Sequence, residues 1–261
     1  MNRSRATMTT ITDSTQDAAP TAGMVVIGNE ILSGKTEDTN APYLCRELRF
    51  LGVDLQRILT IPDDFDLIAA SVRDFSESFT WVFTSGGIGP THDDLTIPAI
   101  ASGFGVPVVK EPRLEEALRT HYQGRLTEEH LRMALLPQGS ELIEVSGLSY
   151  PQIIFRNIFI LPGVPELFRY KFNGIKNRFS GTPIVLRQVY LKADEGSIAR
   201  LLKTTAENHP DVLIGSYPSF FREEYSVKVT LEARAGEAVG SALDELQGRL
   251  NEVAAKVVKV T

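Results

Sequence analysis

The stretch Thr84-Ser85-Gly86-Gly87-Ile88-Gly89-Pro90-Thr91-His92-Asp93-Asp94-Leu95-Thr96 decides the fold that this sequence predicts. It follows the apolar run of residues 81–83 and precedes a segment with helical spacing, so we expect it to join a buried strand to a helix. Three glycines within four residues let backbone N–H groups face a ligand, and the N-terminus of a helix attracts negative charge. The pattern therefore predicts a site for a phosphate or a pyrophosphate.

Two adjacent acids, Asp93 and Asp94, follow the glycines. Their carboxylates would repel a phosphate unless they hold a divalent cation or one of them acts as a base on an attacking water. The alternative is a glycine-rich turn followed by an aspartate that caps a helix. A simple turn rarely needs the Gly-Gly-x-Gly-Pro pattern and an acidic pair together, so we favour the phosphate site.

Strands and helices alternate on the N-terminal side of this loop. Residues 24–27 form an apolar run typical of a buried strand, and residues 53–61 are expected to form the second strand. Between them, residues 44–51 have helical spacing with Asn40 as the expected N-cap, and the next helix is expected to begin at residues 63–64. This βαβαβ order predicts a mostly parallel sheet.

The rest of the chain continues the α/β pattern and then changes. Residues 111–136 predict two helices, and residues 153–155 and 158–161 predict two strands. From residue 182 onward the pattern is that of a small βαββα unit. We therefore expect a disordered segment at residues 1–22, a first domain at residues 23–180 and a small α+β domain at residues 181–261.

Other acidic residues follow the first two predicted strands. The first strand ends at Gly28, and Glu30 and Asp38 come soon after it. The carboxyl ends of parallel strands meet at one edge of a sheet, so these acids could join Asp94 there. Alternatively, Glu30 is a first-turn acid of a helix and Asp38 is a capping residue. Asp63, after the second strand, has the same two interpretations.

A third turn, Pro162-Gly163-Val164-Pro165, closes the strand at residues 158–161. Pro165 suits the first position of a helix, and Gly163 allows a backbone to approach a ligand closely. A purely structural turn is the alternative interpretation.

The composition narrows the class of ligand. A net charge of −6 and an isoelectric point near 5.4 argue against binding of nucleic acid or anionic lipid, which needs clustered positive charge. No apolar run approaches the roughly 20 residues of a membrane span, and residues 1–22 lack the apolar stretch of a secretory signal. The single cysteine, Cys45, excludes an internal disulfide. We expect a cytoplasmic protein that acts on a small molecule, with no nucleic acid or membrane partner.

The three turns together resemble the molybdopterin-binding (MoCF) domain family, in the branch that contains the CinA proteins and the N-terminal part of FAD synthases. The family's Gly-Gly-x-Gly-Pro-Thr-x-Asp-Asp motif falls on residues 86–94, its Gly-x-Glu turn on residues 28–32 and its Pro-Gly-Val-Pro turn on residues 162–165. The resemblance implies a three-layer Rossmann-like α/β domain with a mostly parallel sheet, followed by a small C-terminal α+β domain.

One stretch departs from the CinA pattern, which usually carries Ala-Pro-Gly where this chain has residues 148–152. Together with residues 156–163 and 214–218, this departure makes the chain more similar to the FAD-synthase-associated subfamily.

The resemblance implies a metal-dependent pyrophosphatase, a hydrolase that cleaves ADP-ribose or an FAD-like dinucleotide to two monophosphates. The catalytic residues would be Asp94, Asp63 and Glu30, and Asp93 and Asp94 would hold a divalent metal, Mg²⁺, Mn²⁺ or Co²⁺. The residues that bind the phosphate-bearing ligand would be Gly28, Asp38, Asn40, Ser85, Gly86, Gly87, Gly89, Pro90, Thr91, Pro162 and Gly163.

Two other functions remain open at this point. One is a molybdopterin-binding or adenylyl-transferring protein of molybdenum cofactor biosynthesis, in which the same acidic cradle holds the pterin phosphate. The other is a non-catalytic module that senses a nucleotide. In each case the partner is a phosphate-bearing small molecule, a dinucleotide or molybdopterin, and we expect the chain to form a homo-oligomer.

Overall fold

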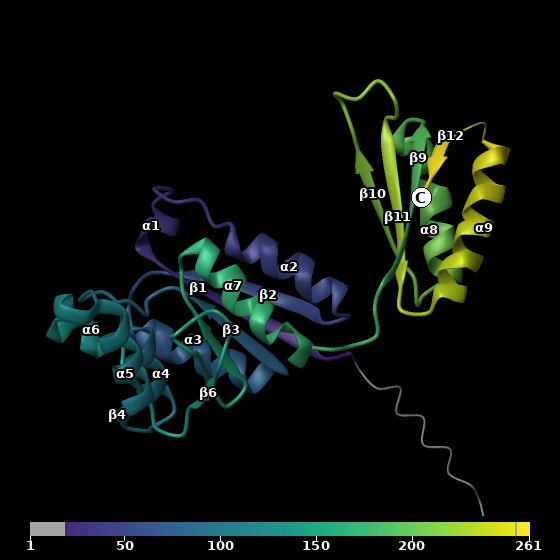
Figure 1. The fold of residues 1–261 in the computed structure, drawn as a ribbon. Helices are drawn as coiled ribbons and strands as arrows, with labels where there is room; N and C mark the ends of the chain where they lie inside the picture. The colour runs from purple at the N-terminus through teal and green to yellow at the C-terminus, as the bar shows by residue number, and fades with distance from the viewer. Residues whose placement is uncertain (1–18, 254) are drawn as a thin grey trace, which may run out of the picture.

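The structure is a computed structural model that describes residues 19–253 and 255–261, and it contains two units with separate hydrophobic cores (Figure 1). The strands of the first unit are β1 (Thr21–Ile27), β2 (Asp54–Ile61), β3 (Trp81–Ser85), β6 (Glu141–Ile143), β7 (Gln152–Phe155) and β8 (Ile158–Leu161). They form one sheet in the order β2-β1-β3-β8-β7-β6. The first four strands in this order run parallel, and β7 and β6 run antiparallel to their neighbours, so the predicted mostly parallel sheet is confirmed.

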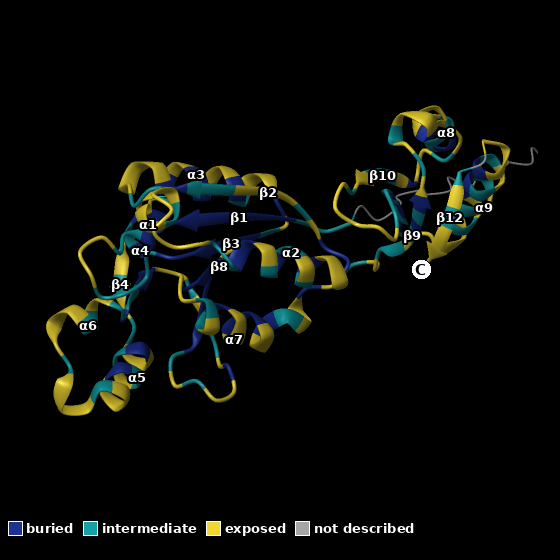
Figure 2. Ribbon diagram, turned by 90° about the horizontal axis from the view of Figure 1, so that it is seen from above, coloured by how far each residue is buried: buried dark blue, intermediate teal, exposed yellow. Residues whose placement is uncertain are grey.

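Helices cover both faces of this sheet and give the predicted three layers. They are α2 (Asn40–Phe50) and α7 (Pro165–Ile175) on one face and α3 (Phe65–Ser78) and α4 (Thr96–Gly103) on the other, with the short α1 (Asn29–Leu32) after β1 and η2 (Lys176–Arg178) after α7. Alternate residues of β1 face the two layers. Met24 and Val26 pack with α2 and α7, whereas Val25 and Ile27 pack with α3 and α4. Figure 2 shows β1 buried along nearly its whole length between these layers.

The segment after α4 agrees only in part with the prediction of two helices across residues 111–136. The elements found are β4 (Val108–Lys110), α5 (Pro112–Tyr122), η1 (Gln123–Arg125), α6 (Glu128–Arg132) and β5 (Leu135–Pro137). The end of the segment is therefore a strand, because β5 pairs antiparallel with β4 and satisfies its backbone groups there. Proline is also poorly suited to extend a helix at Pro137.

Two residues that we assigned to a disordered N-terminal segment belong to the sheet. Thr21 and Ala22 are the first residues of β1, where they lie opposite Asp54 and Leu55 of β2. Neither residue gives an apolar signal in the sequence, yet Ala22 is fully buried because its small side chain packs beside α2. Pro20 precedes the strand, and its carbonyl accepts from the N–H of Asp54 over 2.9 Å. The part of that prediction that covers residues 1–18 lies outside the described residues.

The second unit is a four-stranded antiparallel sheet with two helices packed on its core. Its elements are β9 (Val185–Lys192), α8 (Glu195–Asn208), β10 (Leu213–Pro218), β11 (Val227–Ala233), α9 (Gly236–Glu252) and β12 (Lys256–Val260), with strand order β10-β11-β9-β12. The predicted βαββα order is present, and β12 is an additional strand that its short length concealed. Within residues 19–253 and 255–261, no helix is long and apolar enough to span a membrane.

The two units meet beyond the end of α2. The N–H of Gly181 donates to the Leu51 carbonyl over 2.7 Å, and Arg234 Nη1 donates to the Gly52 carbonyl over 2.8 Å. These bonds hold the start of the second unit against the first.

A half-buried asparagine fastens the β7–β8 hairpin to α3. Asn157 Nδ2 donates to the carbonyls of Ser76 and Phe79 over 3.0 and 2.9 Å, and its Oδ1 accepts from Ser76 Oγ over 2.6 Å. We predict that Asn157→Ala lowers the free energy of unfolding by about 2–3 kcal/mol, because it leaves two carbonyls without donors. Urea unfolding measures this. The exposed Asn177 serves as the control, since Asn177→Ala is expected to change stability by less than about 0.5 kcal/mol, and equal losses in the two variants would contradict the assignment.

Candidate functional site

The loop of residues 86–94, called the glycine loop below, follows β3 and crosses the carboxyl ends of its neighbouring strands. The N–H of Gly86 donates to the Leu161 carbonyl at the end of β8 over 3.2 Å. Gly86 has a φ of +107°, and a Cβ atom there would lie 2.2 Å from the Ile27 carbonyl at the end of β1. Only glycine therefore allows the chain to pass at this point.

Asp94 closes the glycine loop on itself. Its Oδ1 accepts from the N–H of Gly89 over 2.6 Å, and its Oδ2 accepts from the N–H of Thr91 over 2.8 Å. The Thr91 hydroxyl lies 2.6 Å from the same Oδ2 and 2.5 Å from Asp93 Oδ1. The bond with Thr91 lowers the pKa of Asp93 below its usual value. Both acids are consequently hydrogen-bonded within the loop.

The amide donors that remain for a ligand are fewer than the glycine pattern suggests. The N–H groups of Gly86 and Gly89 are already used, by Leu161 and Asp94. Within the described part of the chain, the N–H groups of Gly87 and Ile88 have no acceptor. Both residues line a cavity, so an anion at the loop has two free amides to bind.

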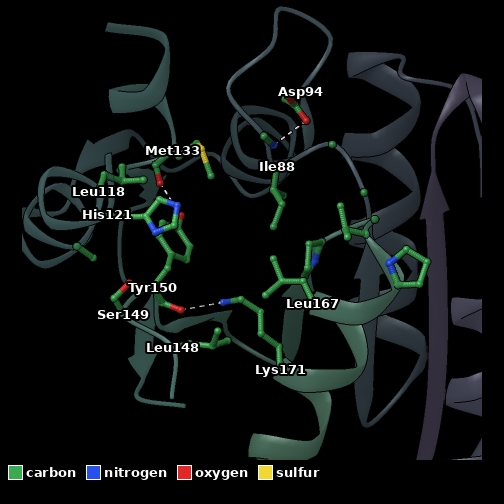
Figure 3. A pocket seen from close by; sticks show the side chains of 18 of the residues that line it. Ile88, Asp94, Leu118, His121, Met133, Leu148, Ser149, Tyr150, Leu167 and Lys171 are labelled. Carbon is green, nitrogen blue, oxygen red and sulfur yellow. Dashed lines mark hydrogen bonds between the residues drawn. The ribbon is translucent and has the colours of Figure 1, made fainter. Parts of the chain in front are cut away.

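This cavity has a volume of about 650 Å³ and extends from the glycine loop to α7 and α5 (Figure 3). Seven predicted site residues line it, namely Glu30, Gly86, Gly87, Gly89, Asp94, Pro162 and Gly163. The rest of the wall is mostly apolar and includes Ile88, Leu118, Met133, Leu148, Tyr150, Leu167 and Lys171. Figure 3 shows Asp94 on one side of the space and Tyr150 with Lys171 on the other.

The remaining predicted site residues lie elsewhere. Ser85, Asp38 and Asn40 line a neighbouring small cavity of about 50 Å³, which shares Glu30 and Gly163 with the large one. Those that line neither cavity are Gly28, Asp63, Pro90, Thr91 and Asp93.

Asp38 and Asn40 hold the start of α2 in place. Asp38 Oδ1 accepts from the N–H groups of Asn40 and Ala41 over 2.9 and 3.1 Å, which is the capping role that the sequence left open. Asn40 is the first residue of α2 and not its N-cap, contrary to our expectation. Its side chain instead donates to Ser85 Oγ over 3.0 Å and to the Gly163 carbonyl over 2.8 Å, so it links two of the predicted turns.

Asp63 and Glu30 differ in their surroundings. Asp63 Oδ2 accepts from the N–H of Asn29 over 2.8 Å, so this carboxylate holds the start of α1. Glu30 is exposed, and its carboxylate has no hydrogen-bond or ion-pair partner in the described part of the chain. It lies over Gly28, where a Cβ atom would be 2.5 Å from Glu30 Oε1. Of these two acids, Glu30 is the one that faces the cavity.

The residues present fit a divalent cation that is shared with phosphate oxygens. Within the described residues, no group of three or more His, Cys, Asp or Glu side chains is placed to bind a metal ion. Mg²⁺ is commonly held by one or two carboxylates together with substrate phosphates, and it needs no such group. Among the described residues, only the N–H of Gly89 donates to Asp94 Oδ1, so this oxygen keeps a further lone pair, and Asp94 lines the cavity.

A buried lysine lies on the opposite wall of the cavity. Lys171 is 3% exposed, and its Nζ donates to the carbonyls of Tyr150 and Pro151 over 3.2 and 2.7 Å. Burial lowers the pKa of Lys171 to about 8. Burial also raises the pKa of Tyr150, whose hydroxyl donates to the Met133 carbonyl over 2.6 Å.

The sequence analysis did not identify Lys171 or the apolar wall. One signal was available, because Lys171 occupies a helical stripe with Phe168, Phe172 and Ile175, all of them buried. A charged residue in such a stripe is unusual. The apolar wall had no comparable signal, since Leu118 and Met133 come from a segment far from the glycine loop in sequence.

Comparison with known families agrees with this architecture. Residues 23–179 match the family described as "Probable molybdopterin binding domain". The chain belongs to the molybdopterin-binding domain family. Beyond the molybdopterin-binding domain, residues 183–259 match "FAD synthase, middle domain", which agrees with the subfamily that residues 148–152 favoured.

Relatives of this chain include a protein of Archaeoglobus fulgidus that is 34% identical over 230 residues, covering 88% of this chain and 97% of the relative. A "Probable FAD synthase" of Caenorhabditis elegans is 31% identical over 257 residues, covering 87% of this chain. This chain spans about half (49%) of that relative's length. The crystal structure of the protein CinA from Thermoplasma acidophilum has a TM-score of 0.57 and 29% identity, and the match covers 61% of this chain and 99% of the CinA chain.

The close approach of Gly86 to the Ile27 carbonyl can be tested by substitution. We predict that Gly86→Ala destabilises the first unit by about 3 kcal/mol or more, since a left-handed backbone and a clash with the Ile27 carbonyl add together. Gly34 has a φ of +70° with open space around its Cβ position, so Gly34→Ala carries the backbone cost alone, about 1 kcal/mol. Chemical unfolding of both variants measures the difference, and equal losses would show that the clash is absent.

The buried charge of Lys171 predicts a dependence of stability on pH. The unfolded chain binds the lysine proton up to about pH 10.5, whereas the folded chain releases it near pH 8, so stability from this group rises between these values. We expect the free energy of unfolding of the wild type, relative to Lys171→Met, to increase across this range by up to about 3 kcal/mol. Tyr150, the titratable side chain in contact with Nζ, stays neutral there because burial raises its pKa. Parallel stability curves for the two proteins would contradict this assignment.

Proposed function

We propose that the first unit binds a nucleotide pyrophosphate, FAD or ADP-ribose, and hydrolyses it to two monophosphates in a metal-dependent reaction. The observation that carries the proposal is the cavity of about 650 Å³, which joins free loop amides and two carboxylates to a large apolar space. A ligand with phosphates at one side and a flat ring at the other matches this division.

The relatives support the choice of a dinucleotide. The C. elegans relative is named a FAD synthase, and residues 183–259 match the middle domain of such enzymes. The name connects that protein with a flavin dinucleotide, and we extend the connection to the ligand of this chain. The family of the first unit supports a phosphate-bearing ligand at the glycine loop.

In the proposed reaction the glycine loop holds the substrate and Glu30 acts on water. The amides of Gly87 and Ile88 bind oxygens of one phosphate. Glu30, the carboxylate without a partner, orients a water and takes its proton. The water oxygen bonds to one phosphorus as the bridging P–O bond breaks, and the bridging oxygen leaves with the other phosphate. FAD then gives FMN and AMP.

Asp94 would hold a divalent cation, Mg²⁺, Mn²⁺ or Co²⁺, together with phosphate oxygens, and the cation would neutralise negative charge on them. Asp93 lies outside the cavity wall, so we assign it to the loop and not to the cation. Asp63 is likewise assigned to the start of α1.

A second candidate function is binding of molybdopterin, or transfer of an adenylyl group to it, with the pterin in the same apolar space. The family to which the first unit belongs favours this alternative. Purified protein that retains molybdopterin would support it. Tight binding of a nucleotide without turnover in any metal would instead indicate a nucleotide-sensing module.

Glu30→Gln provides the sharpest test of hydrolysis, because no group in the described part of the chain forms a hydrogen bond with this carboxylate. We predict metal-dependent release of AMP from FAD or ADP-ribose by the wild type and a loss of about 100-fold or more in the variant. The melting temperature and the affinity for FMN are expected to stay close to those of the wild type. Chromatographic quantification of AMP measures turnover.

The matched control is Glu77→Gln, an exposed glutamate of α3 away from the cavity, which should retain full turnover. Wild-type turnover that persists in Glu30→Gln would remove Glu30 from the reaction. No AMP from either dinucleotide in Mg²⁺, Mn²⁺ or Co²⁺ would rule out the pyrophosphatase.

A further inference from the structure

Lys171 is a charged group in a place that disfavours charge. It lies on α7 between the buried Phe168 and Phe172, and its side chain is 3% exposed. Within the described part of the chain, no carboxylate lies within ion-pair distance of its ammonium group. Burying an isolated cation removes it from water, which is unfavourable for folding, and the same effect lowers the pKa of Lys171.

A structural role does not require the charge. Nearby, the buried Gln152 uses the neutral amide Nε2 to donate to the carbonyls of Ile153 and Ile160, both over 2.7 Å. Lys171 donates to the carbonyls of Tyr150 and Pro151 in a similar way, so an uncharged donor would serve the same purpose. The ammonium group has three N–H donors, and these two carbonyls leave one of them for another acceptor.

The free donor belongs to a residue that lines the large cavity, on the side away from Asp94 (Figure 3). Nζ also lies 5.0 Å from the centre of the Tyr150 ring, which lines the same wall. Leu148 and Leu167 complete an apolar surrounding. This side of the cavity therefore offers one flat aromatic ring, aliphatic contacts and one strong cationic donor.

A ring that carries a carbonyl is the complement of this wall. Flavin and pterin rings both have carbonyl oxygen on a pyrimidine ring, which accepts a hydrogen bond from an ammonium group, whereas adenine has no carbonyl. A phosphate is the other common acceptor for lysine, but the free amides for a phosphate lie at Gly87 and Ile88 in the glycine loop. The glycine-loop wall thus suits a phosphate, whereas the Lys171 wall suits a ring carbonyl.

We infer that Lys171 and Tyr150 form a ring subsite that selects the carbonyl-bearing heterocycle of a phosphorylated flavin or pterin over adenine. This inference deepens the proposed function, on which it rests for the placement of the phosphate at the glycine loop. In that orientation Lys171 donates to the ring carbonyl and the ring packs among Tyr150, Leu148 and Leu167. The ring half of the ligand, and not the adenylate half, then fills the apolar space.

Binding of monophosphates tests the subsite without any turnover. We expect titration calorimetry with the full chain to give tighter binding of FMN, or of a pterin monophosphate, than of AMP. Lys171→Met should weaken binding of the favoured ring compound about 10- to 100-fold, since a hydrogen bond to a charged group is lost. AMP should change by less than about 3-fold. Comparison of FMN with the pterin identifies which ring the subsite prefers.

Two further variants keep the test decisive. Lys171→Gln retains a donor without the charge and should weaken the binding of FMN less than Lys171→Met does. If the methionine variant folds poorly, the glutamine variant still measures the effect of removing the charge. Lys176→Met, on the surface after the same helix, removes one positive charge outside the cavity and should leave binding unchanged.

Equal binding of AMP and the ring compounds by the wild type would overturn the ring subsite, as would equal weakening of all of them in Lys171→Met. Since these monophosphates contain no pyrophosphate bond, ring selectivity that persists in a protein unable to cleave FAD would refute the hydrolase and uphold the subsite. If the protein bound none of the three compounds, FMN, the pterin monophosphate and AMP, both the ring subsite and the hydrolase would be refuted.

Discussion

The site depends on the carboxylate of Asp94, which accepts the amide hydrogens of Gly89 and Thr91 and closes the glycine loop on itself. Without this acid, two amides of a tight turn would compete for other acceptors, including those of a ligand. The loop is anchored again where Gly86 passes the Ile27 carbonyl. These two constraints leave the amides of Gly87 and Ile88 free at the cavity. In the proposed function, the acid next to the phosphate site therefore prepares the loop for phosphate binding.

Charge is distributed unevenly around the cavity, and in the proposed function this distribution orients the ligand. Glu30 and Asp94 are on the wall formed by the strand ends, where negative charge favours a cation beside the phosphates. Lys171 is on the other wall, within apolar surroundings that strengthen any hydrogen bond it donates. A ligand that entered in the reverse direction would place its phosphates in the apolar space and its ring against two carboxylates. That orientation would also leave the free amides of Gly87 and Ile88 without a phosphate oxygen to bind.

The phosphate side of this cavity could be predicted from the sequence because its signals are local. Glycine spacing, the proline turn and the βαβαβ order together place Glu30, Gly87, Asp94 and Gly163 at one sheet edge, and in the structure all four line the same cavity. Adjacent acids are harder to separate. Asp93 and Asp94 have the same chemistry in the sequence, and only the cavity lining in the structure shows that Asp94 reaches the cavity and Asp93 does not.

The ring side could not be predicted in the same way, because its residues come from distant segments. Leu118, Met133 and Tyr150 meet only after α5, α6 and the strand pairs pack on the sheet. A lysine in the apolar stripe of α7 suggests a side chain that extends to solvent, and only the Tyr150 and Pro151 carbonyls show that Lys171 stays inside. The proposed phosphate recognition thus resides in one contiguous motif, whereas the proposed ring recognition is spread over tertiary contacts. Such a division allows the ring ligand to change while the motif stays the same.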